Sequence, residues 1–157
     1  MNENILVRVA AHQFLAGMSA HHIELLANCA SFVQFGEGDV ILRAGEPANG
    51  FYLIESGTVA LEEWIVERGP VATDTLSAGD PLGWSWLFEP YLWHYSARAI
   101  APVTALFFDK AMLQQYRNED LSLGHELFKR MSQVMVRRLQ VARAKLLEAL
   151  HKTDRAK

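Results

Sequence analysis

The sequence predicts a mainly β domain, a sandwich or barrel of short strands, with helices at both ends. Residues 31–108 form strand-length segments that glycine or proline interrupts every 8–12 residues. Residues 4–28 and 109–150 instead carry apolar side chains at helical spacing. With 157 residues, half of them apolar, the chain is long enough for one domain with its own core.

The N-terminal segment reads as two helices. Apolar anchors such as Ile5, Val9 and Ile23 recur at helical spacing, and a break at Gly17–Ser19 places Ser19 as the N-cap of the second helix. We therefore expect a single domain over residues 1–157, with N-terminal helices over 1–30, the strands over 31–108 and C-terminal helices over 109–157.

Within the β-rich part, the segment FYLIESGTVALEEWIV is the clearest candidate for a hairpin. Two apolar runs flank Ser56–Gly57, a dipeptide that is typical of tight turns. The sequence therefore predicts that the strands on either side of Gly57 pair with each other.

The C-terminal part is predicted to be a short helix capped by Asp109, then a long helix from about Asp120 to Leu150. Apolar residues recur along the long helix at spacings of three and four: Phe128, Met131, Met135, Leu139, Ala142, Leu146 and Leu150. This stripe could pack on its own domain or against a second copy. Because it spans about six turns, more than a small roll can cover, we expect a homodimer joined along it.

Composition excludes several classes of protein. The net charge of −3 offers no general attraction to nucleic acid or to anionic lipid, and no apolar run is long enough to span a bilayer. The start lacks the features of a secretory signal, and only HKTDRAK follows Leu150, too short for a helix-turn-helix. We expect a cytoplasmic protein with neither a nucleic-acid nor a membrane partner. The single cysteine, Cys29, predicts a small buried residue rather than a disulfide.

No catalytic or metal-binding pattern is found. The chain has no GxSxG, no P-loop and no paired carboxylates, and His94 lacks a second histidine two residues away. We therefore expect no enzyme activity, no metal and no resident cofactor.

The segment ILRAGEPANGFYLIESG, residues 41–57, carries a recognisable signature. It combines Gly45, Glu46, Ala48, an apolar run over residues 51–54 and Gly57. On these residues the chain resembles the cyclic nucleotide-binding domains, and MVRRLQVARAKL (135–146) is similar to the dimer helix of Crp/Fnr-type regulators. The resemblance implies a double-stranded β-helix, a jelly roll of the cupin-like β-roll kind, followed by a long C-terminal helix. It also implies a sensor domain.

The segment LGWSWLFEPYLWHYSARAIA, residues 82–101, keeps the spacing of that family's phosphate-binding cassette but not its residues. The resemblance implies a glutamate for the ribose hydroxyl and an arginine for the cyclic phosphate. Trp84 replaces the glutamate and Tyr95 the arginine, while Gly83 and Ser96 remain. The family's purine-contacting pair on the long helix corresponds to Ala142 and Arg143.

These replacements predict weak binding of cyclic nucleotides. Removing one partner of a buried charge pair costs roughly 2–5 kcal/mol, or about 30- to 3,000-fold in affinity. Arg98 is a poor substitute because it lies three residues along the strand from position 95 and so faces the other side. Glu89 is an equally weak substitute for the ribose acceptor.

This cassette holds five aromatic residues within a stretch of twelve positions: Trp84, Trp86, Tyr91, Trp93 and Tyr95. Three interpretations stay open: a plug that fills the vacant pocket, a pocket for a flatter and less charged ligand, or a weak cyclic-nucleotide site. The candidate ligand-binding residues are Gly83, Trp84, Ser85, Tyr95, Ser96 and Ala97.

Two functions follow from these patterns. The first is a homodimeric sensor that binds a small molecule, of a kind the sequence does not identify, and acts in trans on another protein. The second is a dimerising scaffold whose pocket is closed by the aromatic residues.

Overall fold

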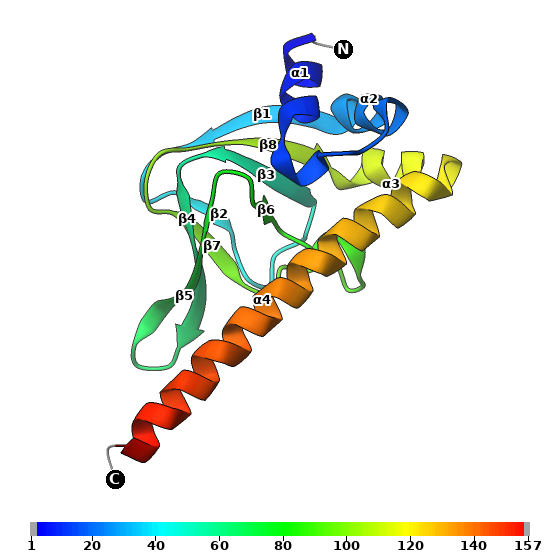
Figure 1. Ribbon diagram of the computed structural model, residues 1–157. Helices are drawn as coiled ribbons and strands as arrows, with labels where there is room; N and C mark the ends of the chain where they lie inside the picture. The colour runs from blue at the N-terminus through cyan, green and yellow to red at the C-terminus, as the bar shows by residue number, and fades with distance from the viewer. Residues whose placement is uncertain (1–2, 156–157) are drawn as a thin grey trace.

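In the computed structural model, which describes residues 3–155, the strands form two antiparallel sheets that face each other as a roll (Figure 1). The first sheet has the order β1-β8-β3-β6 and the second β2-β7-β4-β5. The strands are β1 (Ala30–Phe35), β2 (Val40–Leu42), β3 (Gly50–Ser56), β4 (Thr58–Ile65), β5 (Gly69–Ser77), β6 (Pro81–Leu82), β7 (Ser96–Ala99) and β8 (Val103–Asp109). The β-roll that the resemblance implied is confirmed.

The helices lie at the two ends of the chain, with one short exception inside the roll. They are α1 (Glu3–Ala11), η1 (Gln13–Leu15), α2 (Ala20–Cys29), η2 (Ser85–Leu87), α3 (Lys110–Glu119) and α4 (Leu121–Arg155). Both predicted caps are present, because the Ser19 side chain accepts from the His22 N–H and that of Asp109 from the Met112 N–H. The short helix η1 between α1 and α2 was not expected.

The predicted hairpin around Ser56–Gly57 is wrong. Strand β3 pairs with β8 and β6, whereas β4 pairs with β5 and β7, so the two runs belong to different sheets. Gly57 adopts a φ of +94°, and a Cβ there would lie 2.2 Å from the carbonyl oxygen of Pro102. The turn therefore carries the chain from one sheet to the other, which an apolar pattern on both sides of a glycine does not reveal.

The core lies between the sheets and continues beneath the helices. Phe51 stacks between Phe108 and Trp86, with ring centroids 4.7 Å and 5.3 Å away. Helix α1 is fastened to β3 by Arg8, whose guanidinium donates twice to the Glu55 carboxylate at 2.6 and 2.9 Å. These contacts hold the N-terminal helices against the sheet that also carries β6, the strand that leads into the cassette.

Helix α4 runs diagonally across the roll, and its C-terminal turns extend beyond the strands (Figure 1). Leu123, Leu127, Met131 and Val134 are buried against the domain. From Leu139 onward the apolar side chains are exposed, with Leu146 at 60% and Leu150 at 54%. The predicted stripe therefore divides, since Met131 belongs to the core and Leu139, Ala142 and Leu146 lie at the surface.

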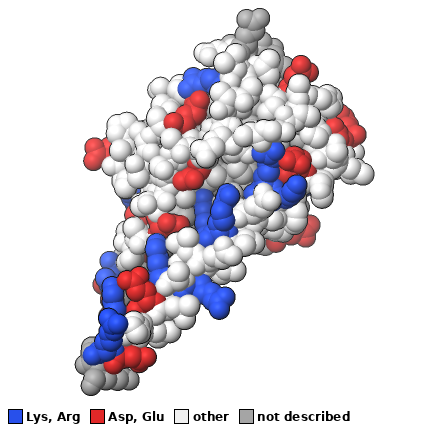
Figure 2. Space-filling view, in the orientation of Figure 1, with Lys and Arg blue, Asp and Glu red and all other residues white. Residues whose placement is uncertain are grey.

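The charged side chains on this face follow α4. Figure 2 shows Lys and Arg groups along the helix, with Asp and Glu groups interspersed. Within residues 3–155, no helix is long and apolar enough to cross a membrane. Cys29 is buried as expected, and burial, with a smaller effect of Asp109, raises the pKa of its thiol to about 12.

Candidate ligand pocket between the cassette and the long helix

The cassette begins at a glycine that no other residue could replace without strain. Gly83 follows β6 with a φ of +92°, and a Cβ there would lie 2.7 Å from the Trp93 ring. The short helix η2 follows at once, and β7 begins at Ser96. The turn at Gly83 therefore sets the direction in which Trp84 and η2 leave the sheet.

A cavity of about 510 Å³ lies between this cassette and α4. We call it the cassette pocket. Leu61, Thr73 and Asp74 line it from β4 and β5, Trp84 and Tyr95 from the cassette, and Met135, Arg138, Leu139, Val141, Ala142 and Lys145 from α4. Its volume is within the range of roughly 300–1,000 Å³ that is usual for small-molecule sites.

Trp84 forms one wall of the cassette pocket, in a fixed orientation. Its ring stacks on His94 with centroids 4.7 Å apart, and it meets Tyr95 edge-on at 6.0 Å. His94 is held in turn by the Ser85 hydroxyl, 2.7 Å from its Nδ1 atom. The wall is thus a preorganised aromatic surface rather than a single mobile side chain.

Tyr95 brings a polar atom to the same wall. Its hydroxyl is buried and donates a hydrogen bond to no residue from 3 to 155. Burial raises the pKa of Tyr95, which the nearby Arg138 guanidinium and the Gly83 N–H offset only in part. The hydroxyl therefore stays neutral at physiological pH and keeps an unused capacity to donate.

Only two of the six candidate residues line the cassette pocket: Trp84 and Tyr95. The Ser85 hydroxyl is hydrogen-bonded to His94, and Ala97 is fully buried in the core. The Ser96 hydroxyl accepts from the Ala44 N–H at 3.0 Å. Gly83 acts through the turn described above.

The five aromatic residues do not act as one cluster. Trp86 and Trp93 are 1% and 5% exposed and belong to the core, while Tyr91 lies under the Lys110 ammonium at 3.5 Å. Trp84 and Tyr95 alone border the cassette pocket. The spacing of aromatic residues in the sequence did not indicate this division.

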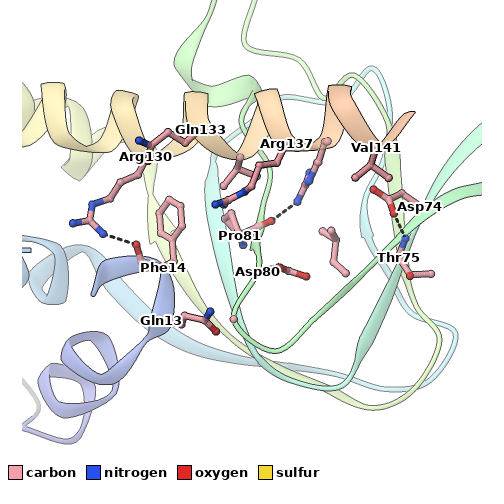
Figure 3. A pocket seen from close by; sticks show the side chains of 14 residues that line it. Gln13, Phe14, Asp74, Thr75, Asp80, Pro81, Arg130, Gln133, Arg137 and Val141 are labelled. Carbon is pink, nitrogen blue, oxygen red and sulfur yellow. Dashed lines mark hydrogen bonds between the residues drawn. The ribbon is translucent and has the colours of Figure 1, made fainter. Parts of the chain in front are cut away.

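Arg138 was missed by sequence reasoning, which interpreted it as solvated helix charge. The guanidinium donates to the Pro81 carbonyl at 2.8 Å, the bond drawn beside Pro81 in Figure 3, and its side chain lines the cassette pocket. The charged residues among the described lining are two cations, Arg138 and Lys145, and one carboxylate, Asp74. Its place directly before the exposed Leu139 gave no signal that this arginine lines a pocket.

Arg98 behaves as the strand geometry predicts. It donates to Glu62 at 3.2 Å and to the Gly38 carbonyl at 3.0 Å, on the outer side of the second sheet. It therefore does not substitute for the family's phosphate-binding arginine.

A second cleft, of about 520 Å³, adjoins the cassette pocket and shares Asp74, Arg138 and Val141 with it. Figure 3 shows Arg130 and Arg137 extending from α4 toward it, with Gln13 and Asp80 on the opposite side. Arg130 fastens α4 to η1 through the carbonyls of Phe14 and Ala16, at 2.8 and 2.9 Å. Arg138 thus stands at the boundary between two hollows.

The geometry of the domain is thus a β-roll whose cassette faces a long C-terminal helix. The model of the family described as "Cyclic nucleotide-binding domain" matches residues 32–120, more than half of the chain. The chain therefore belongs to the cyclic nucleotide-binding domain family. Comparison with curated proteins gives no match.

Solved structures agree on the fold. A protein described as cyclic nucleotide-binding, from Geobacter metallireducens GS-15, is 25% identical at a TM-score of 0.73, over 85% of this chain and 96% of its own. The sensor domain of the transcriptional regulator DNR from Pseudomonas aeruginosa is 18% identical at 0.69, over 88% and 95%.

A third solved structure is the regulatory subunit of a cAMP-independent protein kinase A from Trypanosoma cruzi, bound to guanosine. It is 21% identical at a TM-score of 0.64, over 72% of this chain and 40% of its own. These structures share the fold of this chain.

Proposed function

We propose that this domain is a sensor that binds a flat organic molecule in the cassette pocket and binds cyclic AMP and cyclic GMP only weakly. The observation that carries the proposal is the cavity of about 510 Å³ whose cassette wall is Trp84 and Tyr95. An aromatic wall stabilises a planar ligand by stacking, and the unpaired hydroxyl of Tyr95 supplies one directional hydrogen bond.

The pocket's volume favours this interpretation over an aromatic plug. Trp86 and Trp93 pack in the core, so the cavity between Trp84 and α4 stays open. The T. cruzi regulatory subunit bound to guanosine is a precedent for an uncharged nucleoside on this fold. Binding without catalysis is the proposed activity, in keeping with a family described by the nucleotide that it binds.

Arg138 adds a cation to the pocket, although from the helix rather than from the strand. One of its amino groups is committed to the Pro81 carbonyl, so it neutralises an anion less completely than a free arginine would. This supports weakened rather than absent contact with a cyclic phosphate.

Tryptophan fluorescence tests the proposal. The protein is titrated with guanosine, adenosine, indole and both cyclic nucleotides. We expect a saturable change with at least one planar, uncharged compound. Trp84→Phe should abolish most of that change, whereas Trp64→Phe, at an exposed position on β4, should preserve it. Silence across the whole panel would favour the scaffold.

We also propose that the domain acts as a homodimer, cytoplasmic and acting in trans on another protein. The exposed apolar side chains on α4, among them Leu139, Leu146 and Leu150, support it, because apolar side chains that recur on an exposed helix favour association. Sedimentation at micromolar concentration should give a dimer that Met135→Glu with Leu139→Glu converts to monomer. A monomeric wild type, or a dimer that survives both changes, would contradict this.

A further inference from the structure

A separate cavity of about 340 Å³ lies between η2 and the elbow where α3 meets α4. We call it the hinge cavity. It shares no lining residue with the cassette pocket. Trp84 lines the cassette pocket, whereas Trp86 and Leu87 line the hinge cavity. The short helix η2 is therefore flanked by two different hollows.

The interior of the hinge cavity is apolar. Trp86, Leu113 and Leu127 line it and are at most 2% exposed. Leu121 and Phe128, which are 79% and 48% exposed, form its outer part together with the exposed polar residues Asn118 and His125. A surface of this kind is covered favourably by a hydrocarbon or aromatic group.

One cation at the edge of this cavity, Arg117, has no partner among the described residues. Arg117 is half-buried and makes no hydrogen bond or ion pair with any residue from 3 to 155, Glu119 included. Its aliphatic part crosses Gly124 so closely that a Cβ there would lie 2.4 Å from the Arg117 Cγ. The glycine therefore permits the arginine to lie along the cavity.

Two carboxylates at the start of α4, Asp120 and Glu126, are engaged elsewhere. Asp120 caps the start of α4 through Ser122 and lies 3.3 Å from His22, and Glu126 pairs with Arg130 at 2.8 Å. The hydrogen bond from Ser122 lowers the pKa of Asp120, and that from Arg130 lowers the pKa of Glu126. Neither is available to neutralise Arg117.

A second polar group here is also unsatisfied. The Trp86 indole N–H is buried and has no hydrogen-bond partner within the described residues. Buried donors are almost always paired, so an orphan beside a cavity is a feature that needs an acceptor. The cavity thus combines an apolar wall, an unpaired cation and an unused donor.

We propose that the hinge cavity binds a small amphipathic carboxylic acid, with its apolar part against Trp86 and Leu127 and its carboxylate on Arg117. A guanidinium pairs with a carboxylate in a bidentate, charge-assisted geometry that an ammonium or a neutral donor does not match. The volume of about 340 Å³ suits a medium-chain or single-ring acid rather than a long lipid.

The test compares octanoate with octanamide, which has the same chain but no charge. Calorimetric titration and thermal melting are carried out on the wild type, Arg117→Met and Arg137→Met. Methionine keeps the packing over Gly124 and removes the charge, and Arg137 is an exposed arginine of α4 outside the hinge cavity. Losing a charged hydrogen-bond partner costs about 1.5–3 kcal/mol, so we expect octanoate to bind roughly tenfold or more tightly than octanamide.

The variants decide the outcome. Arg117→Met should remove the preference for octanoate, and Arg137→Met should keep it. Equal binding of the two compounds to the wild type, equal losses in both variants, or no saturable binding of octanoate would each overturn the proposal. The cassette pocket is not involved, since Trp84→Phe should leave octanoate binding unchanged.

Discussion

Residues 41–57 and residues 82–101 both keep the spacing of the family, but they differ in which of the family's residues they keep. In the first segment the shared residues are glycines and a buried strand, with Phe51 and Leu53 fully buried. In the second, the glycine turn at position 83 is kept while Trp84 and Tyr95 occupy the ligand-facing positions. The backbone frame and the ligand chemistry are therefore encoded by separate residues.

The largest expected effect on stability comes from Trp86, which lies in the cassette segment but packs in the core. Removing a fully buried aromatic ring costs about 3–5 kcal/mol, so Trp86→Ala should destabilise the fold by that amount. Trp84→Ala, at a half-buried pocket wall, should cost less than half as much. Urea denaturation of both variants measures the contrast, and equal losses would show that Trp84 is also a core residue.

Gly57 tests the frame in the first segment. Gly57→Ala imposes left-handed strain and a clash with the Pro102 carbonyl, together about 2–5 kcal/mol. Gly45 is the matched control, since its φ is +88° but a Cβ added there would meet no atom within 4 Å. Gly45→Ala should therefore cost only the strain, about 1–2 kcal/mol. Similar stability losses for the two alanine variants would refute the steric argument.

Arg138 should contribute to stability as well as to the pocket. Arg138→Met removes the bond to the Pro81 carbonyl that ties α4 to β6, at a cost of about 1–2 kcal/mol for a partly exposed group. Arg137→Met should be within about 0.5 kcal/mol of the wild type. The pair is compared by thermal unfolding, and identical melting temperatures would mean that the bond contributes nothing.

Tyr95→Phe has the smallest expected effect on the free energy of unfolding, and the direction of that effect is informative. Tyr95→Phe removes a buried hydroxyl without a partner, so the unliganded protein should be unchanged or up to about 1 kcal/mol more stable. Because burial raises the pKa of Tyr95, the folded state holds the proton when the unfolded state releases it above pH 10. The wild type should therefore lose stability relative to Tyr95→Phe as the pH rises past 10. A destabilised variant at pH 7 would reveal a partner for the hydroxyl.

Much of the fold could be predicted because its signals are local. Ser19 and Asp109 cap helices through side chains that lie within three residues of the N–H groups they accept from. The family signature at residues 41–57 implied the roll. The pairing of β3 was not predictable in the same way, since its partners β8 and β6 come from distant parts of the chain.

The site was predicted only in part for the same reason. Trp84 and Tyr95 follow from their places in the cassette and line the pocket. Arg138 lies more than forty residues later in the chain, and only the packing of α4 on the roll brings it beside Tyr95. Long-range contacts of this kind leave no periodic signal in the sequence.

Calorimetric titration with cyclic AMP and cyclic GMP tests the central claim most directly, that the frame is kept while its ligand chemistry has changed. We predict dissociation constants no tighter than about 100 μM, from the lost strand arginine and ribose glutamate. Trp84→Glu with Tyr95→Arg should then strengthen binding, because the turn at Gly83 is intact. Low-micromolar binding by the wild type would contradict the account.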